Sequence, residues 1–266
     1  MTYLQFHLLF IFPPLLLLLL LQPWRGRGRG AWKFLPLLAI LAFIYTTPWD
    51  NYLVWRGVWG YGPERVIAII GYVPVEEYLF FILQPLLTGL WLYLMLGSAK
   101  KAPQDVSGTA TRIRISGALM YLALAAAGAV MLTTERGTYL GLILAWACPV
   151  LAAQWAYAGH RVVERLRASV LGVAVPTLYL WVADAVAIRL GIWDITPRFT
   201  FGLRPFGLPI EEAVFFLVTN VLVVQGLILF LYPPGSTGVM GWRRIERSSS
   251  LSQFNHPPDL PVDARL

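Results

Sequence analysis

The chain has 266 residues, of which 58% are hydrophobic and only 13% charged, and its formal net charge is +7. This composition excludes an ordinary soluble domain and indicates an integral membrane protein. The basic residues lie in short loops rather than on one folded face, so the positive charge does not indicate nucleic-acid binding. Cys148 is the only cysteine, which excludes an intrachain disulfide and a thiol-ligated metal centre.

Seven segments are long and apolar enough to cross a bilayer, which takes about 20 residues. In chain order they are residues 3–21, 31–47, 74–96, 113–132, 138–158, 169–188 and 209–232. The first segment lacks a basic start and a cleavage site, so we expect it to remain as a helix rather than to be removed as a signal peptide. The sequence therefore predicts an all-α integral membrane protein with about seven transmembrane helices.

Lys and Arg are distributed unevenly between the two sides of these segments. Of the 21 Lys and Arg residues, 15 lie in the loops after the first, third and fifth segments and in the C-terminal region, whereas six lie in the other loops. Basic loops stay in the cytoplasm. We therefore expect a multi-pass protein of the cell membrane, with its N-terminus outside and its C-terminus cytoplasmic.

The sequence also contains an internal repeat with an offset of 134 to 136 residues. The tripeptide TYL occurs at 2–4 and again at 138–140, and GVW at 57–59 corresponds to GIW at 191–193. The longest matched motif is PVEEYLFF at 74–81 and PIEEAVFF at 209–216. Four crossings separate equivalent segments, so the two copies should have the same orientation in the membrane, as a parallel repeat.

The repeat predicts four parts of the chain. A first three-helix repeat covers residues 1–100, a connecting helix lies within 101–136, and a second three-helix repeat covers 137–232. Residues 233–266 are rich in Pro, Ser and Arg and contain no apolar span, so we expect a disordered cytoplasmic tail. A functional site should lie at the interface between the two repeats.

Carboxylates are costly inside a membrane and are functional there by default. Six of them recur at matched positions of the repeat: Asp50, Glu76, Glu77, Asp184, Glu211 and Glu212. The predicted topology places all six at one depth, near the outer boundary of the hydrocarbon. A carboxyl group that faces a dry cavity tends to keep its proton near neutral pH, so at least one Glu of each pair could act as an acid. The alternative is a structural role, in which each Glu pairs with a nearby Arg or caps its helix.

Prolines and aromatic residues complete the repeated motif. Pro74 and Pro209 are expected to open the third and seventh helices, because proline is well tolerated at the first helical position. Paired phenylalanines follow one turn after the glutamates and share their helical face: Phe80, Phe81, Phe215 and Phe216. Aromatic faces attract cations, so these rings would suit a reaction that passes through a carbocation, although phenylalanine is also ordinary lipid-facing filler.

Other kinds of site are not indicated. The GRGRG run at 26–30 follows no strand, so it does not predict a dinucleotide site. His7, His160 and His256 are scattered without partners at metal-ligand spacing. We therefore expect neither a cofactor nor a metal, and the remaining chemistry is acid and base catalysis by carboxylates on a substrate that dissolves in the bilayer.

The doubled Pro-x-Glu-Glu-x-x-Phe-Phe motif on tandem three-helix halves resembles the small membrane lycopene cyclases of bacteria, archaea and fungi. The resemblance covers roughly residues 1–232. It implies that a carboxylic acid protonates an acyclic end group of lycopene, that the resulting cation closes a ring, and that a carboxylate removes a proton to leave a β-ionone ring. Such a reaction has no net redox change. The resemblance implies a catalytic role for the four motif glutamates, whereas Asp50 and Asp184 are candidates from the repeat alone.

The resemblance implies a carotenoid substrate, membrane lipid as surroundings and other membrane enzymes of carotenoid synthesis as partners. Three alternatives stay open: a cyclase of C50 carotenoids, a carotenoid hydratase in which water traps the same cation, and a proton-relaying transporter or scaffold without catalysis. The sequence leaves undecided whether one or both substrate ends are cyclised, which Glu is the acid, and the oligomeric state.

Overall fold

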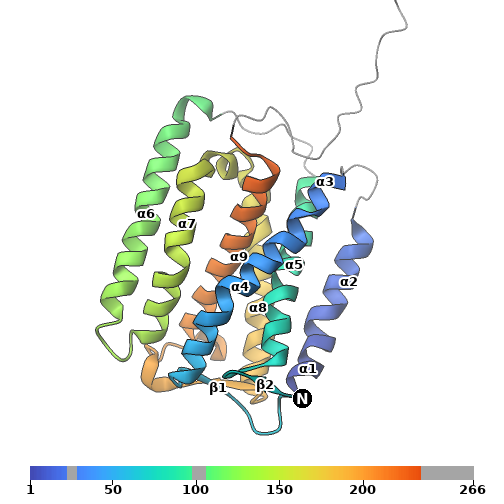
Figure 1. The fold of residues 1–266 in the computed structure, drawn as a ribbon, viewed down its shortest axis with the longest axis vertical. Helices are drawn as coiled ribbons and strands as arrows, with labels where there is room; N and C mark the ends of the chain where they lie inside the picture. The colour runs from blue at the N-terminus through green and yellow to red at the C-terminus, as the bar shows by residue number, and fades with distance from the viewer. Residues whose placement is uncertain (23–28, 98–105, 235–266) are drawn as a thin grey trace, which may run out of the picture.

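The computed structural model describes residues 1–22, 29–97 and 106–234, and it is a bundle of long helices (Figure 1). The predicted tail lies outside the described residues from 235 onward. The helices are α1 (Tyr3–Phe6), α2 (Phe12–Leu21), α3 (Arg29–Trp32), α4 (Phe34–Trp55), α5 (Val75–Gly97), α6 (Ala110–Met131), α7 (Thr138–Glu164), α8 (Leu166–Arg189) and α9 (Ile210–Leu231). A π-helical turn, His7–Ile11, joins α1 to α2.

The prediction of an all-α membrane protein is confirmed. Among the described residues, six helical stretches are long and apolar enough to span a bilayer: Tyr3–Leu21, Val75–Gly97, Ser107–Met131, Thr138–Glu164, Leu166–Arg189 and Ile210–Leu231. The expected number was about seven. The difference is the second segment, which forms α4 and has sufficient length, but Pro48, Asp50 and Asn51 in its second half lower its hydropathy.

Equivalent helices of the two sequence copies run in the same direction (Figure 1). The first copy supplies α2, α4 and α5, and the second supplies α7, α8 and α9. In each copy the chain runs up, then down, then up in this view, and α6 connects the copies by running down. The boundaries of the predicted repeats are not tested by this arrangement and stay a prediction.

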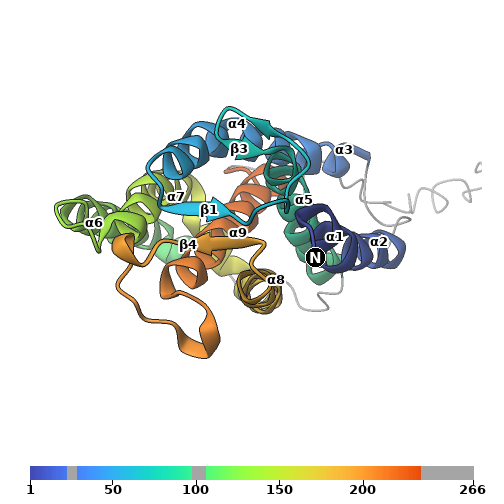
Figure 2. The same cartoon turned by 90° about the horizontal axis from the view of Figure 1, so that it is seen from below.

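Two short strands join the copies at the end of the bundle where α5 and α9 begin (Figure 2). Strand β1 (Trp59–Tyr61) pairs antiparallel with β4 (Trp193–Ile195), and Gly60 is opposite Asp194 at the centre of the ladder. These two residues are equivalent in the sequence repeat, at an offset of 134. A local twofold axis therefore passes through the ladder. A second pair, β2 (Ile69–Ile70) with β3 (Val73–Pro74), leads into α5.

The helices α5 and α9 form the centre of the bundle. In the most apolar stretch of each of them 61% is buried, against 11% in α6. A buried polar cluster holds them together at mid-depth. Asn220 Oδ1 accepts hydrogen bonds from Gln84 Nε2 at 2.7 Å and from Thr88 Oγ1 at 2.6 Å. Asn220 Nδ2 donates to Thr177 Oγ1 of α8 at 3.0 Å. Polar partners in apolar surroundings fix the register of these three helices.

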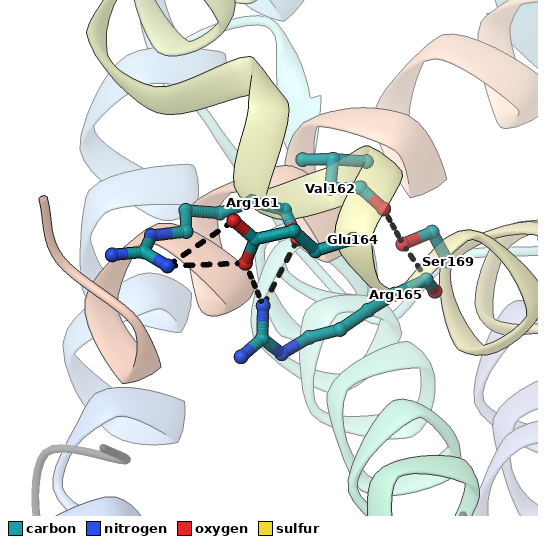
Figure 3. A network of polar contacts seen from close by, with 5 residues as sticks. All are labelled: Arg161, Val162, Glu164, Arg165 and Ser169. Carbon is teal, nitrogen blue, oxygen red and sulfur yellow. Dashed lines mark hydrogen bonds and ion pairs between the residues drawn. The ribbon is translucent and has the colours of Figure 1, made fainter. Parts of the chain in front are cut away.

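At the opposite end of the bundle α7 turns into α8 (Figure 1), and Figure 3 shows the polar contacts at this corner. Glu164 accepts hydrogen bonds from Arg161 Nη1 at 3.1 Å and from Arg165 Nη1 at 2.8 Å. Ser169 Oγ donates to the carbonyl oxygens of Val162 and Arg165 across the corner. Arg161, Glu164 and Arg165 therefore form ion pairs with one another, far from the repeated glutamates.

Candidate functional site

The six repeated carboxylates belong to the ends of four helices that meet at one end of the bundle. Asp50 and Asp184 lie near the ends of α4 and α8, and the glutamate pairs lie in the first turns of α5 and α9. All six side chains are buried, none more than 9% exposed. Helices α5 and α9 begin one residue later than predicted, since Pro74 belongs to β3 and Pro209 is the N-cap of α9. The motif prolines therefore precede the helices instead of opening them.

The first glutamate of each pair binds backbone. Glu76 Oε1 accepts a hydrogen bond from the amide N–H of Ile67 at 2.9 Å, and Glu211 Oε1 accepts one from Phe201 at 2.7 Å. Ile67 and Phe201 are equivalent in the repeat, at an offset of 134. Glu76 and Glu211 thus attach the loop that precedes each helix to the first turn of that helix.

The second glutamate of each pair accepts hydrogen bonds from tyrosine hydroxyls. Tyr3 Oη donates to Glu77 Oε2 at 2.5 Å, and Tyr139 Oη donates to Glu212 Oε1. Both tyrosines come from the repeated TYL tripeptide. Sequence reasoning found that tripeptide but gave it no role. Tyr61 in β1 also donates to Glu77 Oε2, at 3.4 Å.

The two aspartates differ, although their positions in the repeat match. Asp184 Oδ1 accepts a hydrogen bond from Trp193 Nε1 at 2.8 Å. Neither carboxyl oxygen of Asp50 has a partner among the described residues, and neither does Nε1 of Trp59, the equivalent of Trp193. The local twofold symmetry therefore holds for the bonds that Tyr3 and Tyr139 donate to the glutamates, and it is broken at the aspartates and by the extra donor Tyr61.

A cavity of about 30 Å³ lies between these side chains. Three carboxyl groups reach it: Glu77, Asp184 and Glu212. The rest of its lining is aromatic apart from one leucine, and consists of Tyr3, Phe6, Trp59, Tyr61, Phe80, Leu180, Trp193, Phe215 and Phe216. The cavity holds carboxyl groups against ring faces, which is the arrangement expected for proton transfer to a substrate that becomes a cation.

Only some of the residues predicted from the sequence line the cavity. Phe80, Phe215 and Phe216 line it, whereas Phe81 packs edge-on against Tyr78 at a centroid distance of 5.9 Å. Glu76, Glu211 and Asp50 are buried nearby but do not line it. The missed residues include Tyr3, Trp59 and Trp193. All three stand in the repeated TYL and GVW/GIW motifs, so their duplication was the signal that could have identified them.

No arginine of the described residues forms an ion pair with a candidate carboxylate. Across residues 1–22, 29–97 and 106–234, the ion pairs involve only Glu164 and Glu135 as acids. The alternative in which each repeated Glu pairs with a nearby Arg is therefore wrong. In the same part of the chain, no three His, Cys, Asp or Glu side chains are grouped to hold a metal ion.

Tyr61 is an ionisable group of the site that lies outside the membrane spans. The Tyr61 phenol is buried in β1 beside Glu77, and burial together with that carboxylate raises the pKa of Tyr61 well above its ordinary value. Tyr61 therefore remains a neutral hydrogen-bond donor at physiological pH.

Comparisons with known proteins give a consistent picture. The family described as lycopene cyclase matches residues 1–96 and 136–230. A lycopene beta-cyclase of Halobacterium salinarum is 44% identical over 232 residues, which is 87% of this chain and 96% of that protein. Bifunctional lycopene cyclase/phytoene synthases of Phycomyces blakesleeanus and Gibberella fujikuroi are 36% and 37% identical. The match covers 84% and 85% of this chain but only 38% and 39% of those proteins. No solved structure matches the chain significantly.

Proposed function

This chain belongs to the lycopene cyclase family, and we propose that it is a lycopene β-cyclase that converts the acyclic end groups of lycopene into β-ionone rings. The observation that carries the proposal is the cavity in which Glu77 and Glu212, from equivalent positions of the repeat, meet among aromatic rings. The 44% identity to a lycopene beta-cyclase over most of both chains supports the choice of substrate.

The reaction needs one proton in and one proton out. A carboxylic acid at the cavity adds a proton to the terminal double bond of the substrate, which leaves a tertiary cation. The nearby double bond of the same end group attacks that cation and closes a six-membered ring, which moves the positive charge into the ring. A carboxylate then removes a ring proton, and the electron pair of that C–H bond becomes the ring double bond. The balance requires no oxidant or reductant.

Glu77, Asp184 and Glu212 are the proposed catalytic residues, because their carboxyl groups reach the cavity. Phe80, Phe215 and Phe216 are proposed to bind the end group and to stabilise its cation, at about 0.5–2 kcal/mol for each well-placed ring. Glu76 and Glu211 are proposed to position the loops that close the site, and Asp50 to complete the buried carboxyl cluster.

We further propose the cell membrane as the location, with the N-terminus outside and the C-terminus in the cytoplasm. The distribution of Lys and Arg supports this orientation. The carboxyl cavity then lies near the outer leaflet, since the N-terminus and the starts of α5 and α9 share one end of the bundle (Figure 1). Lipid surrounds the bundle, and membrane enzymes that make lycopene or use the cyclic product are the proposed partners. A reporter that fluoresces only in the cytoplasm, fused to the C-terminus, should be bright.

Expression in a host that accumulates lycopene tests the function. Chromatography of the extracted pigments should show β-carotene, or γ-carotene if one end is cyclised. A hydroxylated acyclic product would instead identify a hydratase. Unchanged lycopene, with the protein inserted in the membrane as shown by a fluorescent fusion, would refute the proposal. Supplying a C50 acyclic carotenoid in a parallel culture establishes whether the longer substrate is preferred.

A further inference from the structure

The carboxyl cavity is much too small for a carotenoid. Its volume is about 30 Å³, and a single water molecule already needs about 10–15 Å³ of such space. Even if the aromatic rings move apart to admit one end group, the long polyene of the substrate must lie elsewhere. The location of the polyene matters only if the substrate is a carotenoid, so this inference rests on the proposed function.

A second and larger hollow begins beside the cavity. It has a volume of about 450 Å³ and lies between α8 and α9. Leu180 lines the cavity and the next residue, Trp181, lines the groove; likewise Phe216 lines the cavity and Leu217 the groove. The groove and the cavity therefore occupy adjoining faces of the same two helices at the same depth.

The groove extends from that point towards the opposite end of the bundle. Its lining on α8 runs from Trp181 back to Leu166. At 1.5 Å per helical residue, this distance is roughly 22 Å. The hollow is therefore long and narrow and parallel to the helices, which is the shape that an extended polyene requires.

The lining is apolar even where polar residues contribute to it. Thr177 Oγ1 accepts a hydrogen bond from Asn220 inside the bundle, and Gln225 Nε2 donates to Tyr121 Oη at 2.8 Å. Trp181 Nε1 donates to the carbonyl oxygen of Ala213 at 2.9 Å. These polar atoms are occupied by protein partners, whereas Gln225 Oε1 is buried without a partner among the described residues. The groove therefore offers mainly van der Waals contact.

We propose that the groove between α8 and α9 binds the polyene chain of the substrate while one end group occupies the carboxyl cavity. The position beside the cavity, the length and the apolar lining all fit an extended hydrocarbon. A lipid acyl chain has similar chemistry, but only the polyene requires a site beside the carboxyl cavity, because its end group reacts there.

Two matched tryptophan variants test this assignment. Val173 lines the groove, whereas Val175, two residues along the same helix, does not and is 39% exposed. Each substitution is made in a Glu77→Gln, Glu212→Gln background, so that bound lycopene is not consumed. The proteins are purified in detergent from a lycopene-accumulating host, and the pigment per protein is read from absorbance. Val173→Trp should reduce bound lycopene at least about tenfold, and Val175→Trp should leave it unchanged.

The outcomes separate the possibilities. If Val173→Trp is correctly inserted and binds as much lycopene as the control but loses co-purified phospholipid, the groove holds lipid and the proposal is wrong. Should Val173→Trp fail to insert, Ala174→Trp, at the next groove position, is measured in the same way. Loss of lycopene from both the groove variant and the control refutes the assignment too. Failure of the unsubstituted chain to cyclise lycopene, with Val173→Trp still blocking its binding, would overturn the proposed function but not the groove.

Discussion

The hydroxyl of Tyr61 lies 3.4 Å from Glu77 Oε2, and no equivalent donor serves the second half of the site. Tyr61 corresponds to Ile195 in the repeat, and Ile195 has no hydroxyl to offer Glu212. Among the described residues, Glu77 thus accepts from two phenols and Glu212 from the single phenol of Tyr139. Hydrogen bonds from hydroxyls favour the ionised form of a carboxyl group, so the two halves are chemically unequal, and we expect them to divide the reaction.

Substitution of the four glutamates should separate them into two classes. Glu77→Gln and Glu212→Gln keep the side-chain volume but remove a group that exchanges protons at the cavity. Each should reduce conversion of lycopene by about 10²- to 10⁴-fold. Glu76→Gln and Glu211→Gln retain an amide oxygen that can still accept from the loop, so each should lose less than the variant of its neighbour. The measurement is cyclic pigment per unit of inserted protein.

A control variant of that series is Glu164→Gln, which lies at the opposite end of the bundle and should leave conversion unchanged. Equal losses for Glu76→Gln and Glu77→Gln would contradict the assignment of separate roles.

The asymmetry around Glu77 and Glu212 can be tested by exchanging the donor between the halves. Tyr61→Phe removes the second hydroxyl from Glu77, and Ile195→Tyr introduces one on the other side. If the halves divide the work, product composition should change in both variants, because a cation that loses its proton more slowly can be trapped by water or lose a different proton. Chromatography of the pigments reads this directly. Products identical to those of the wild type in both variants would show that the second phenol has no chemical role.

The broken symmetry of the aspartates predicts unequal effects of two tryptophan replacements. Trp193→Phe removes the donor to Asp184 and leaves a buried oxygen without a partner, which should cost about 1–3 kcal/mol of stability. Trp59→Phe removes an indole N–H that has no partner among the described residues, so it should cost less. Thermal unfolding of the two proteins in the same detergent gives the comparison, and a larger loss for Trp59→Phe would contradict the described hydrogen bonding.

The exposed ion pair between Arg198 and Glu135 should give a pH-dependent contribution outside the membrane spans. Hydrogen bonding and the positive charge of Arg198 lower the pKa of Glu135. A lowered pKa means that the pair stabilises the fold above the ordinary pKa of glutamate and stops doing so as the pH falls below the folded pKa. The melting temperature of Arg198→Gln should therefore be slightly below that of the wild type at pH 7 and approach it in acid.

High salt gives an independent check on that pair, because both side chains are exposed and salt screens such charges. A difference between wild type and Arg198→Gln that is unaffected by either acid or salt would show that the ion pair is not its source.

Much of the site could be predicted from the sequence because the repeat marks it. The repeat alone makes Glu77, Glu212 and Asp184 candidates, together with Phe80, Phe215 and Phe216, and each of these residues lines the cavity. The distinction within each glutamate pair was not predictable. Adjacent residues on a helix point about 100° apart, so the two glutamates of a pair meet different neighbours. Which of them reaches the cavity depends on the position of α1, α7 and the loops around that helix.

The sequence by itself determined the membrane class, the duplicated architecture and the chemistry available, because composition and periodicity govern how segments partition into lipid. Only the tertiary structure decided that Glu77 and Glu212 share one cavity with Asp184, while Glu76 and Glu211 hold loops. It also decided that Trp193 donates a hydrogen bond to Asp184, whereas neither Trp59 nor any other described residue does so to Asp50. Packing determines these differences, since side chains that match in sequence acquire unlike neighbours once two non-identical halves pack together.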